Sequence, residues 1–79
     1  MKHLIPEGHI ETVLEILRSR PGDWYVYDMM KATGLHSGDI YPVLASLERR
    51  GIVSSYWVPQ GSGQPRRRAY SLLIVAGGN

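Results

Sequence analysis

The stretch DIYPVLASLERRGIV, residues 39–53, decides the fold that we expect for this 79-residue chain. Its apolar residues recur at the i, i+3, i+4, i+7 spacing of one helix face, namely Ile40, Val43, Leu44 and Leu47. Pro42 falls near the fourth or fifth helical position, at the boundary of the first turn, at a cost of about one helix hydrogen bond. Arg49 and Arg50 suit the negative end of the helix dipole, and Gly51 ends the helix. The pattern therefore predicts a helix with a proline near its start.

Two further helices are predicted before this stretch. Residues 9–19 form one amphipathic stripe through Ile10, Val13, Leu14 and Leu17. Residues 20–23, RPGD, stop that helix. A second helix is predicted from Trp24 to Thr33, with Asp23 as its N-cap and Gly34 beyond its end. The short linker to the third helix, whose cap is Ser37 or Gly38, is typical of a helix-turn-helix.

Two strands are predicted after the helices. Residues 52–58 are β-branched and aromatic, and residues 69–74 alternate, with Tyr70, Leu72 and Ile74 on one face. The loop between them holds two glycines, two prolines and three arginines. The order predicts an α+β, mainly α fold, a winged helix-turn-helix with three helices and a two-stranded β-hairpin wing. We expect a single domain over residues 1–79, with a core at 9–74 and flexible ends at 1–8 and 75–79.

Charge is distributed unevenly along the chain, although the net charge is only +2. Residues 1–44 carry four basic and six acidic side chains, whereas residues 45–79 carry five arginines and Glu48. Such a basic region is typical of a protein that binds a polyanion, usually nucleic acid, although a solvated basic face is the alternative. The chain has no cysteine and no apolar run long enough to span a membrane, so we expect a cytoplasmic protein.

Three motifs together give a resemblance to a known family. The segments YDMMK, GDIYPVLASLERRGIVSSYWV and QPRRRAYSL, in this order, resemble the N-terminal domain of PadR-type transcriptional regulators. The resemblance implies a winged helix, DNA binding and repression, usually as a dimer. By motif, it places Gly38, Tyr41 and Pro42 at the DNA-facing start of the recognition helix and residues 66–68 in the wing. A homodimer is possible, either through the first helix together with residues 1–8 or through residues 73–75. A monomer is the alternative.

The predicted recognition site lies at the start of the third helix, whose width fits the major groove of DNA. Its candidate DNA-binding residues are His36, Ser37, Gly38, Asp39, Tyr41, Pro42 and Ser46. Gly38 lets the backbone come close, and the Ser37 and Tyr41 hydroxyls can bond phosphate. Asp39 is either a helix cap or an acceptor from cytosine, and we favour the cap. Half-buried packing is the alternative for Tyr41, and a kink without a recognition role is the alternative for Pro42.

The predicted wing site is the loop between the strands, with candidate DNA-binding residues Gln60, Ser62, Gln64, Arg66, Arg67 and Arg68. One nearby glutamate cannot pair all three arginines, so they can donate bidentate bonds to phosphate or enter a narrow minor groove. A solvated loop is the alternative. Trp24 and Trp57 are interpreted as packing residues, and a ligand or partner surface is their alternative.

The sequence shows no pattern typical of an enzyme. The three histidines, His3, His9 and His36, are too scattered for a metal site, and we find no nucleophile motif, phosphate-binding loop or paired-carboxylate cleft. We therefore expect no catalysis, no cofactor and no membrane partner. The favoured function is a sequence-specific regulator of double-stranded DNA. A protein–protein or RNA interaction module and a ligand-responsive sensor using Trp24 and Trp57 are the alternatives.

Overall fold

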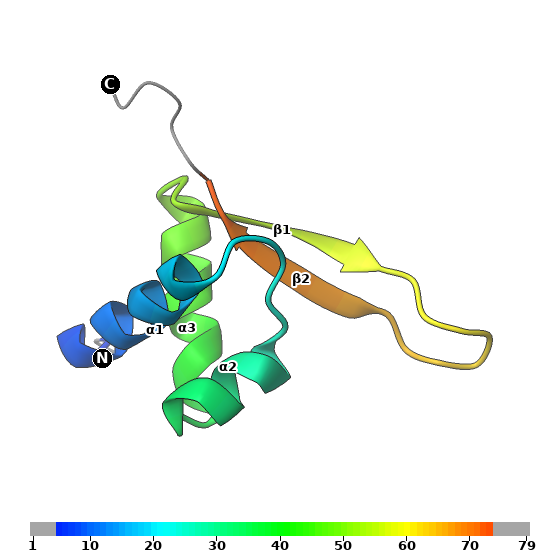
Figure 1. The fold of residues 1–79 in the computed structure, drawn as a ribbon, viewed down its shortest axis with the longest axis horizontal. Coiled ribbons are helices and arrows are strands. Elements are labelled where there is room, and N and C mark those ends of the chain that lie inside the picture. The colour runs from blue at the N-terminus through cyan, green and yellow to red at the C-terminus, as the bar shows by residue number, and fades with distance from the viewer. Residues whose placement is uncertain (1–4, 74–79) are drawn as a thin grey trace, which may run out of the picture.

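The chain forms three helices followed by an antiparallel two-stranded hairpin in the computed structural model, which describes residues 5–73 (Figure 1). The elements are α1 (Glu7–Ser19), α2 (Val26–Thr33), α3 (Ser37–Arg49), β1 (Val53–Val58) and β2 (Arg67–Leu72). This order confirms the predicted winged helix-turn-helix, mainly α. His3 and Ile74 lie outside the described residues, as do residues 1–4 of the predicted end 1–8 and the whole predicted end 75–79.

The ends of α1 and α2 differ from the predicted ones. Helix α1 begins at Glu7, two residues early, because Pro6 precedes it and the Pro6 carbonyl accepts the N–H of His9 at 2.9 Å. Helix α2 begins at Val26, and its N-cap residue is Tyr25, whose N–H donates to the Asp28 carboxylate at 3.4 Å. The prediction of Asp23 as the cap was wrong. The Asp23 carboxylate instead accepts a hydrogen bond from the Tyr56 hydroxyl of β1.

Two glycines end α2 and α3 as the sequence predicts. Gly34 has a φ of 80°, a left-handed conformation that glycine adopts readily, and its N–H donates to the Met30 carbonyl at 2.8 Å. Gly51 has a φ of 75°, and the N–H of the following Ile52 returns to the Leu47 carbonyl at 2.9 Å. The sharp exit after Gly51 leads directly into β1.

The hairpin carries a short third segment at its inner end. Strands β1 and β2 pair from Val53↔Leu72 to Val58↔Arg67. Trp24, between α1 and α2, forms an isolated antiparallel bridge to Tyr70, with both backbone hydrogen bonds at 2.8 Å. The base of the hairpin is therefore tied to the helical part of the domain, while its tip projects from it (Figure 1).

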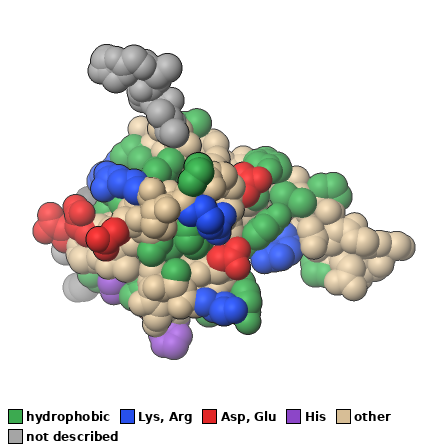
Figure 2. All heavy atoms as spheres, in the orientation of Figure 1, with side chains coloured by type: hydrophobic (Ala, Val, Ile, Leu, Met, Phe, Trp, Pro, Cys, Tyr) green, Lys and Arg blue, Asp and Glu red, His purple; other side chains and the backbone are tan. Residues whose placement is uncertain are grey.

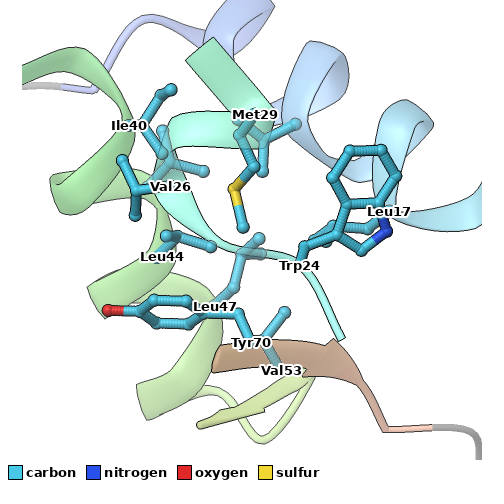
Figure 3. Packing of buried hydrophobic residues seen from close by; sticks show 11 residues of the cluster. Leu17, Trp24, Val26, Met29, Ile40, Leu44, Leu47, Val53 and Tyr70 are labelled. Carbon is cyan, nitrogen blue, oxygen red and sulfur yellow. The ribbon is translucent and has the colours of Figure 1, made fainter. Parts of the chain in front are cut away.

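The core lies where the helices meet the base of the hairpin (Figure 3). Met29 is fully buried at its centre, and Ile40 and Leu44 of α3 face it. Trp24 and Tyr70 close the core on the hairpin side, and the indole N–H of Trp24 donates to the Arg20 carbonyl at 3.2 Å. This burial confirms the packing role predicted for Trp24. The packing of α3 against this core leaves one stripe of the helix facing outward, and that stripe is the first part of the site.

Candidate nucleic-acid interface

The outward stripe of α3 is the first part of the site. Ile40, Val43, Leu44 and Leu47 are buried, so the opposite side of the helix faces solvent. The exposed residues of the stripe are Gly38, Tyr41, Pro42, Ala45 and Arg49. Tyr41 is 52% exposed, which argues against half-buried packing as its role. Pro42 is the sixth residue of the helix, one turn deeper than a proline of the first turn, and it removes the N–H that would bond the Gly38 carbonyl.

The start of α3 is capped by its own third residue. The Asp39 carboxylate accepts the backbone N–H of His36 at 3.3 Å, and His36 rather than Ser37 or Gly38 is the N-cap residue. This contact satisfies one backbone donor at the helix start and agrees with the favoured cap role of Asp39. Ser37 is half-buried and His36 is exposed.

Gly38 is not required by the interior of the protein. No atom of the described residues lies within 4 Å of a Cβ built at Gly38, and its backbone is not in the left-handed region. A side chain here would project into open space, so the small size of Gly38 leaves room for a body outside the protein.

Ser46 is a correction to the predicted site. It is only 6% exposed, whereas the sequence analysis placed it on the outward face. Helix α3 contacts α1, α2 and β1, and these three neighbours cover a wider arc of the helix than its four-residue apolar stripe suggests. Ser46 therefore cannot reach a base edge in this conformation.

The wing consists of the loop 59–66 and the strand ends that hold it. Gln60, Ser62, Gln64 and Arg66 are exposed in this loop. The Gln60 amide donates to the carbonyls of Val58 and Pro59 at 3.3 and 3.2 Å, so it serves the loop itself. The Gln64 N–H donates to the Gly61 carbonyl at 2.9 Å and closes a tight turn at the tip.

The three arginines occupy three different environments. Arg66 is exposed and its guanidinium lies 5.0 Å from the ring centre of Trp57. Arg67 begins β2, rather than ending the loop, and lies 3.8 Å over the ring of Tyr25. Both side chains have rings beneath them and solvent around them, an arrangement in which cation–π attraction orients a charge without neutralising it.

Arg68 is the exception among the arginines, because it joins the hairpin to α3. Its Nε donates to the Ser55 hydroxyl at 2.9 Å, and the Ser55 hydroxyl donates to the Glu48 carboxylate at 2.6 Å. Its guanidinium also lies 3.5 Å from Glu48. Arg68, Ser55 and Glu48, hereafter the Arg68 network, therefore link β2, β1 and α3. The sequence analysis placed Arg68 with the wing residues that contact DNA, and its position favours a positioning role.

The helix start and the arginines meet at one hollow of about 410 Å³, called hollow A here. Ser37 and Tyr41 line it from α3, and Arg66, Arg67 and Arg68 line it from the hairpin. Further lining residues that the sequence analysis did not propose as DNA contacts are Tyr25, Tyr27 and Trp57. Trp57 is 48% exposed, so the packing interpretation holds for Trp24 but only partly for Trp57.

Helix α2 contributes residues to this face that sequence reasoning missed. Tyr27 is 61% exposed, and the Lys31 ammonium lies 5.3 Å from its ring centre. Helical periodicity could have identified these residues from the sequence, because Tyr27 and Lys31 are four residues apart on the side of the helix away from Val26 and Met29.

A second hollow, hollow B, lies on the other flank of α3 and has a volume of about 500 Å³. Pro42, Ala45 and Arg49 line it from α3, and Ile5 and His9 line it from the start of α1. The outward stripe of α3 is thus a ridge with a hollow on each side.

Three of the seven acidic side chains lie together on α1. Glu7, Glu11 and Glu15 are all exposed on α1, and Figure 2 shows acidic side chains grouped over that helix, away from the hairpin. Within residues 5–73, no His, Cys, Asp or Glu side chains form a group of three that could hold a metal ion. No helix in the described part of the chain is long and apolar enough to cross a membrane.

Comparisons with known proteins give the family. Residues 13–73 match the model of the transcriptional regulator PadR-like family. A PadR-like transcription factor from Bacteroides fragilis has a similar structure, with a TM-score of 0.67, 24% identity, and coverage of 84% of this chain and 67% of that chain. A Streptococcus mutans protein also has a similar structure, with a TM-score of 0.64, 28% identity, and coverage of 92% of this chain and 70% of that chain. Curated protein sequences give no significant match. Because the family model spans most of its length, the chain belongs to the PadR-like family of transcriptional regulators.

Proposed function

We propose that this protein binds double-stranded DNA in a sequence-specific manner and represses transcription where it binds. The ridge of α3 enters the major groove, and the wing lies on the adjacent backbone or in the minor groove. A helix with its side chains is about 10–12 Å wide, which matches the roughly 12 Å major groove.

The observation that carries this proposal is the composition of hollow A. One surface receives a helix start from α3 and three guanidinium groups from the hairpin, of which Arg68 is paired with Glu48. Helix starts attract phosphate, and arginines bind it through bidentate hydrogen bonds. The two elements can therefore act on one duplex together, which is what a winged helix needs for DNA binding.

The flanks of the ridge divide the contacts between the two DNA strands. Arg66, Arg67 and Lys31 lie on the side of hollow A, and the Tyr27 hydroxyl is exposed beside them. Arg49 lies on the side of hollow B. Phosphate contacts of this kind set the position and orientation of the protein, and the ridge between them contacts the base edges.

The salt dependence of binding tests the role of the arginines. We expect log K to fall linearly with log salt concentration for the wild-type protein, measured by fluorescence anisotropy with a labelled duplex. Arg66→Ala and Arg67→Ala should each weaken binding to every sequence and reduce the slope by about 0.9.

Arg18→Ala is the matched control, because it removes one positive charge from α1, where Arg18 lines a third hollow beside Leu72. It should leave the slope nearly unchanged. Equal effects of all three substitutions would show that net charge, and not the wing, governs binding, and unchanged affinity of both wing variants would refute the wing assignment.

Repression and a homodimer are the remaining parts of the proposal. A protein that covers promoter DNA excludes the polymerase, so occupancy alone gives repression, and we place this activity in the cytoplasm. The expression of a reporter gene placed behind the selected site should fall.

The homodimer has a separate test. A palindromic consensus from selection on random duplexes, together with two chains per duplex in sedimentation, would indicate the homodimer, since two-fold operators mirror two-fold proteins.

The two alternative functions receive less support from the structure. An interaction module would be favoured by a joined patch of Tyr56 and Trp57 with Arg50 buried, but Arg50 is exposed and the two rings, as neighbours in a strand, point to opposite faces. A sensor built on both tryptophans would need them in one pocket, but Trp24 lies in the core while Trp57 lines hollow A.

A further inference from the structure

The middle of the ridge is apolar, and this carries an inference about which bases the proposed DNA-binding helix reads. Pro42 and Ala45 are exposed on the outward stripe of α3, with the Tyr41 ring beside them. Neither Pro42 nor Ala45 has a side-chain donor or acceptor. Pro42 and Ala45 therefore cannot read a base pair by side-chain hydrogen bonds.

The polar side chains around Pro42 and Ala45 lie at the edges of the ridge: Arg49 and His9 line hollow B, and Tyr41 is exposed on the side of hollow A. The Asp39 carboxylate accepts the His36 N–H at 3.3 Å, and Ser46 is buried. The guanidinium groups of Arg66 and Arg67 lie over the rings of Trp57 and Tyr25 on the wing side. At the centre of the ridge, the surface offered to the major groove is hydrocarbon.

One base in DNA presents hydrocarbon to the major groove, and that base is thymine, through its C5-methyl group. Pro42 and Ala45 are three residues apart, so they are separated by about 4.5 Å along the helix axis. The rise per base pair is about 3.4 Å, so the two side chains match methyl groups on neighbouring base pairs.

We propose that Pro42 and Ala45 read thymine methyl groups, so that shape contact to methyl rather than hydrogen bonding determines sequence preference at the centre of the site. The proposal rests on the proposed DNA binding and identifies its preferred substrate class as duplexes with thymine at one or two adjacent positions under α3. Ala45 and Pro42 are then specificity-determining residues, and Arg66 and Arg67 add affinity for DNA of any base sequence.

Deoxyuridine separates the methyl group from base pairing, because it differs from thymidine only by that methyl. The full chain is used to select its site from random duplexes, and each thymidine of the selected duplex is then replaced singly by deoxyuridine. We expect a loss of about three- to fivefold in affinity at one or two adjacent positions and little change elsewhere. Replacing the same thymine with cytosine should weaken binding, and 5-methylcytosine should recover part of the loss.

Two protein variants assign the effect to the ridge. In Ala45→Gly, thymidine and deoxyuridine at the contacted position should bind equally well, because the methyl has lost its partner. Ala32→Gly is the matched control, since Ala32 is exposed on α2 and the same backbone change is made there. This control should keep the full deoxyuridine effect.

The outcomes separate this inference from the function on which it rests. If no selected duplex binds better than random DNA, the proposed function itself fails. If a selected duplex binds specifically but tolerates deoxyuridine at every position, DNA binding stands and methyl reading is refuted. A deoxyuridine effect that persists unchanged in Ala45→Gly and Pro42→Ala refutes the assignment to the ridge.

Discussion

Gly38 is a residue whose size matters to the outside of the protein and not to its inside. A Cβ at this position meets no atom of the described chain within 4 Å, and the backbone needs no left-handed conformation. A glycine within a helix costs about 0.5–1 kcal/mol relative to alanine. The protein thus carries a weaker helix start than its own fold requires, and the proposed approach of DNA to this backbone would account for it.

Gly38→Ala should consequently separate stability from binding. We expect the free energy of unfolding to rise by about 0.5 kcal/mol, measured by urea denaturation, because alanine has less conformational entropy to lose on folding than glycine. DNA affinity should fall severalfold in anisotropy measurements. Gly8→Ala in α1, where a Cβ also meets open space, is the control and should leave affinity unchanged. A Gly38→Ala protein that binds DNA as tightly as the wild type would show that the backbone does not approach the duplex.

Tyr70 makes the stability of the domain sensitive to alkaline pH. Burial in the core raises the pKa of the Tyr70 hydroxyl above its ordinary value of 10.0. The pKa of Tyr56 is also raised, chiefly by its hydrogen bond to Asp23. A group with a raised pKa stabilises the folded state fully below its unfolded pKa, and this stabilisation is lost as pH rises through the folded pKa.

The free energy of unfolding should therefore fall above about pH 10 in the wild-type protein. Tyr70→Phe should show a shallower fall, because phenylalanine has no proton to lose, and Tyr56 should account for part of the remaining slope. Urea denaturation at a series of pH values from 8 to 11 measures both curves. Parallel curves for the two proteins would contradict the assignment to Tyr70.

The hairpin and α3 are joined as elements by the Arg68 network. Ser55 is its centre, since its hydroxyl accepts from Arg68 and donates to Glu48. The ion pair itself is about one third exposed, so it adds little stability in water, and the two charge-assisted hydrogen bonds of the Ser55 hydroxyl provide most of the link. The network therefore holds one element in a fixed orientation on the other more than it stabilises the whole domain.

Ser55→Ala breaks this link without changing any charge. We expect a loss of about 1 kcal/mol in the free energy of unfolding, the usual contribution of a hydrogen bond, and faster hydrogen exchange at amides of β1 and β2. Ser54→Ala is the control, because Ser54 points to the other face of the same strand. Equal exchange rates in the two variants would mean that Ser55 does not hold the hairpin in place.

The elements themselves could be predicted from the sequence, because each one has a local signal. The periodic apolar residues of α3, the glycines after α2 and α3, and the β-branched residues of β1 act over a few residues. The errors involve contacts between distant residues. Asp23 was predicted to cap α2, but Tyr56 lies 33 residues away and reaches it only after the hairpin has formed. Ser46 was misplaced on the outward face because the neighbours of α3 come from three separate elements, and the contacts of Arg68 with Ser55 and Glu48 likewise join residues that are distant in the sequence.

At the scale of the whole molecule, one tryptophan lies on the proposed DNA face and the other lies in the core. Trp57 is half-exposed beside Arg66 and Arg68, each 5.0 Å from its ring centre, whereas Trp24 is buried. The two indoles thus report on different parts of the protein. The fluorescence of Trp57 depends on these guanidinium groups and on solvent, and both change if phosphate arrives at hollow A.

Addition of duplex DNA should therefore change the tryptophan fluorescence of the wild-type protein. Trp57→Phe should abolish most of this change, because only the buried Trp24 remains. Titration of both proteins with the same unlabelled duplex provides the measurement, and circular dichroism of the variant confirms that it is folded. A change of equal size in the variant would place the duplex elsewhere on the surface or indicate a rearrangement of the core.

The Arg68 network has a geometric consequence for the operator that the proposed function implies. Because it fixes the hairpin on α3, the base pairs under the helix and those under the wing are separated by a set number of steps. One inserted base pair would move the two parts of the site apart by about 3.4 Å and rotate them by about 35° around the duplex. The protein could then occupy one part or the other but not both, so this operator should tolerate substitutions between its two parts and reject insertions.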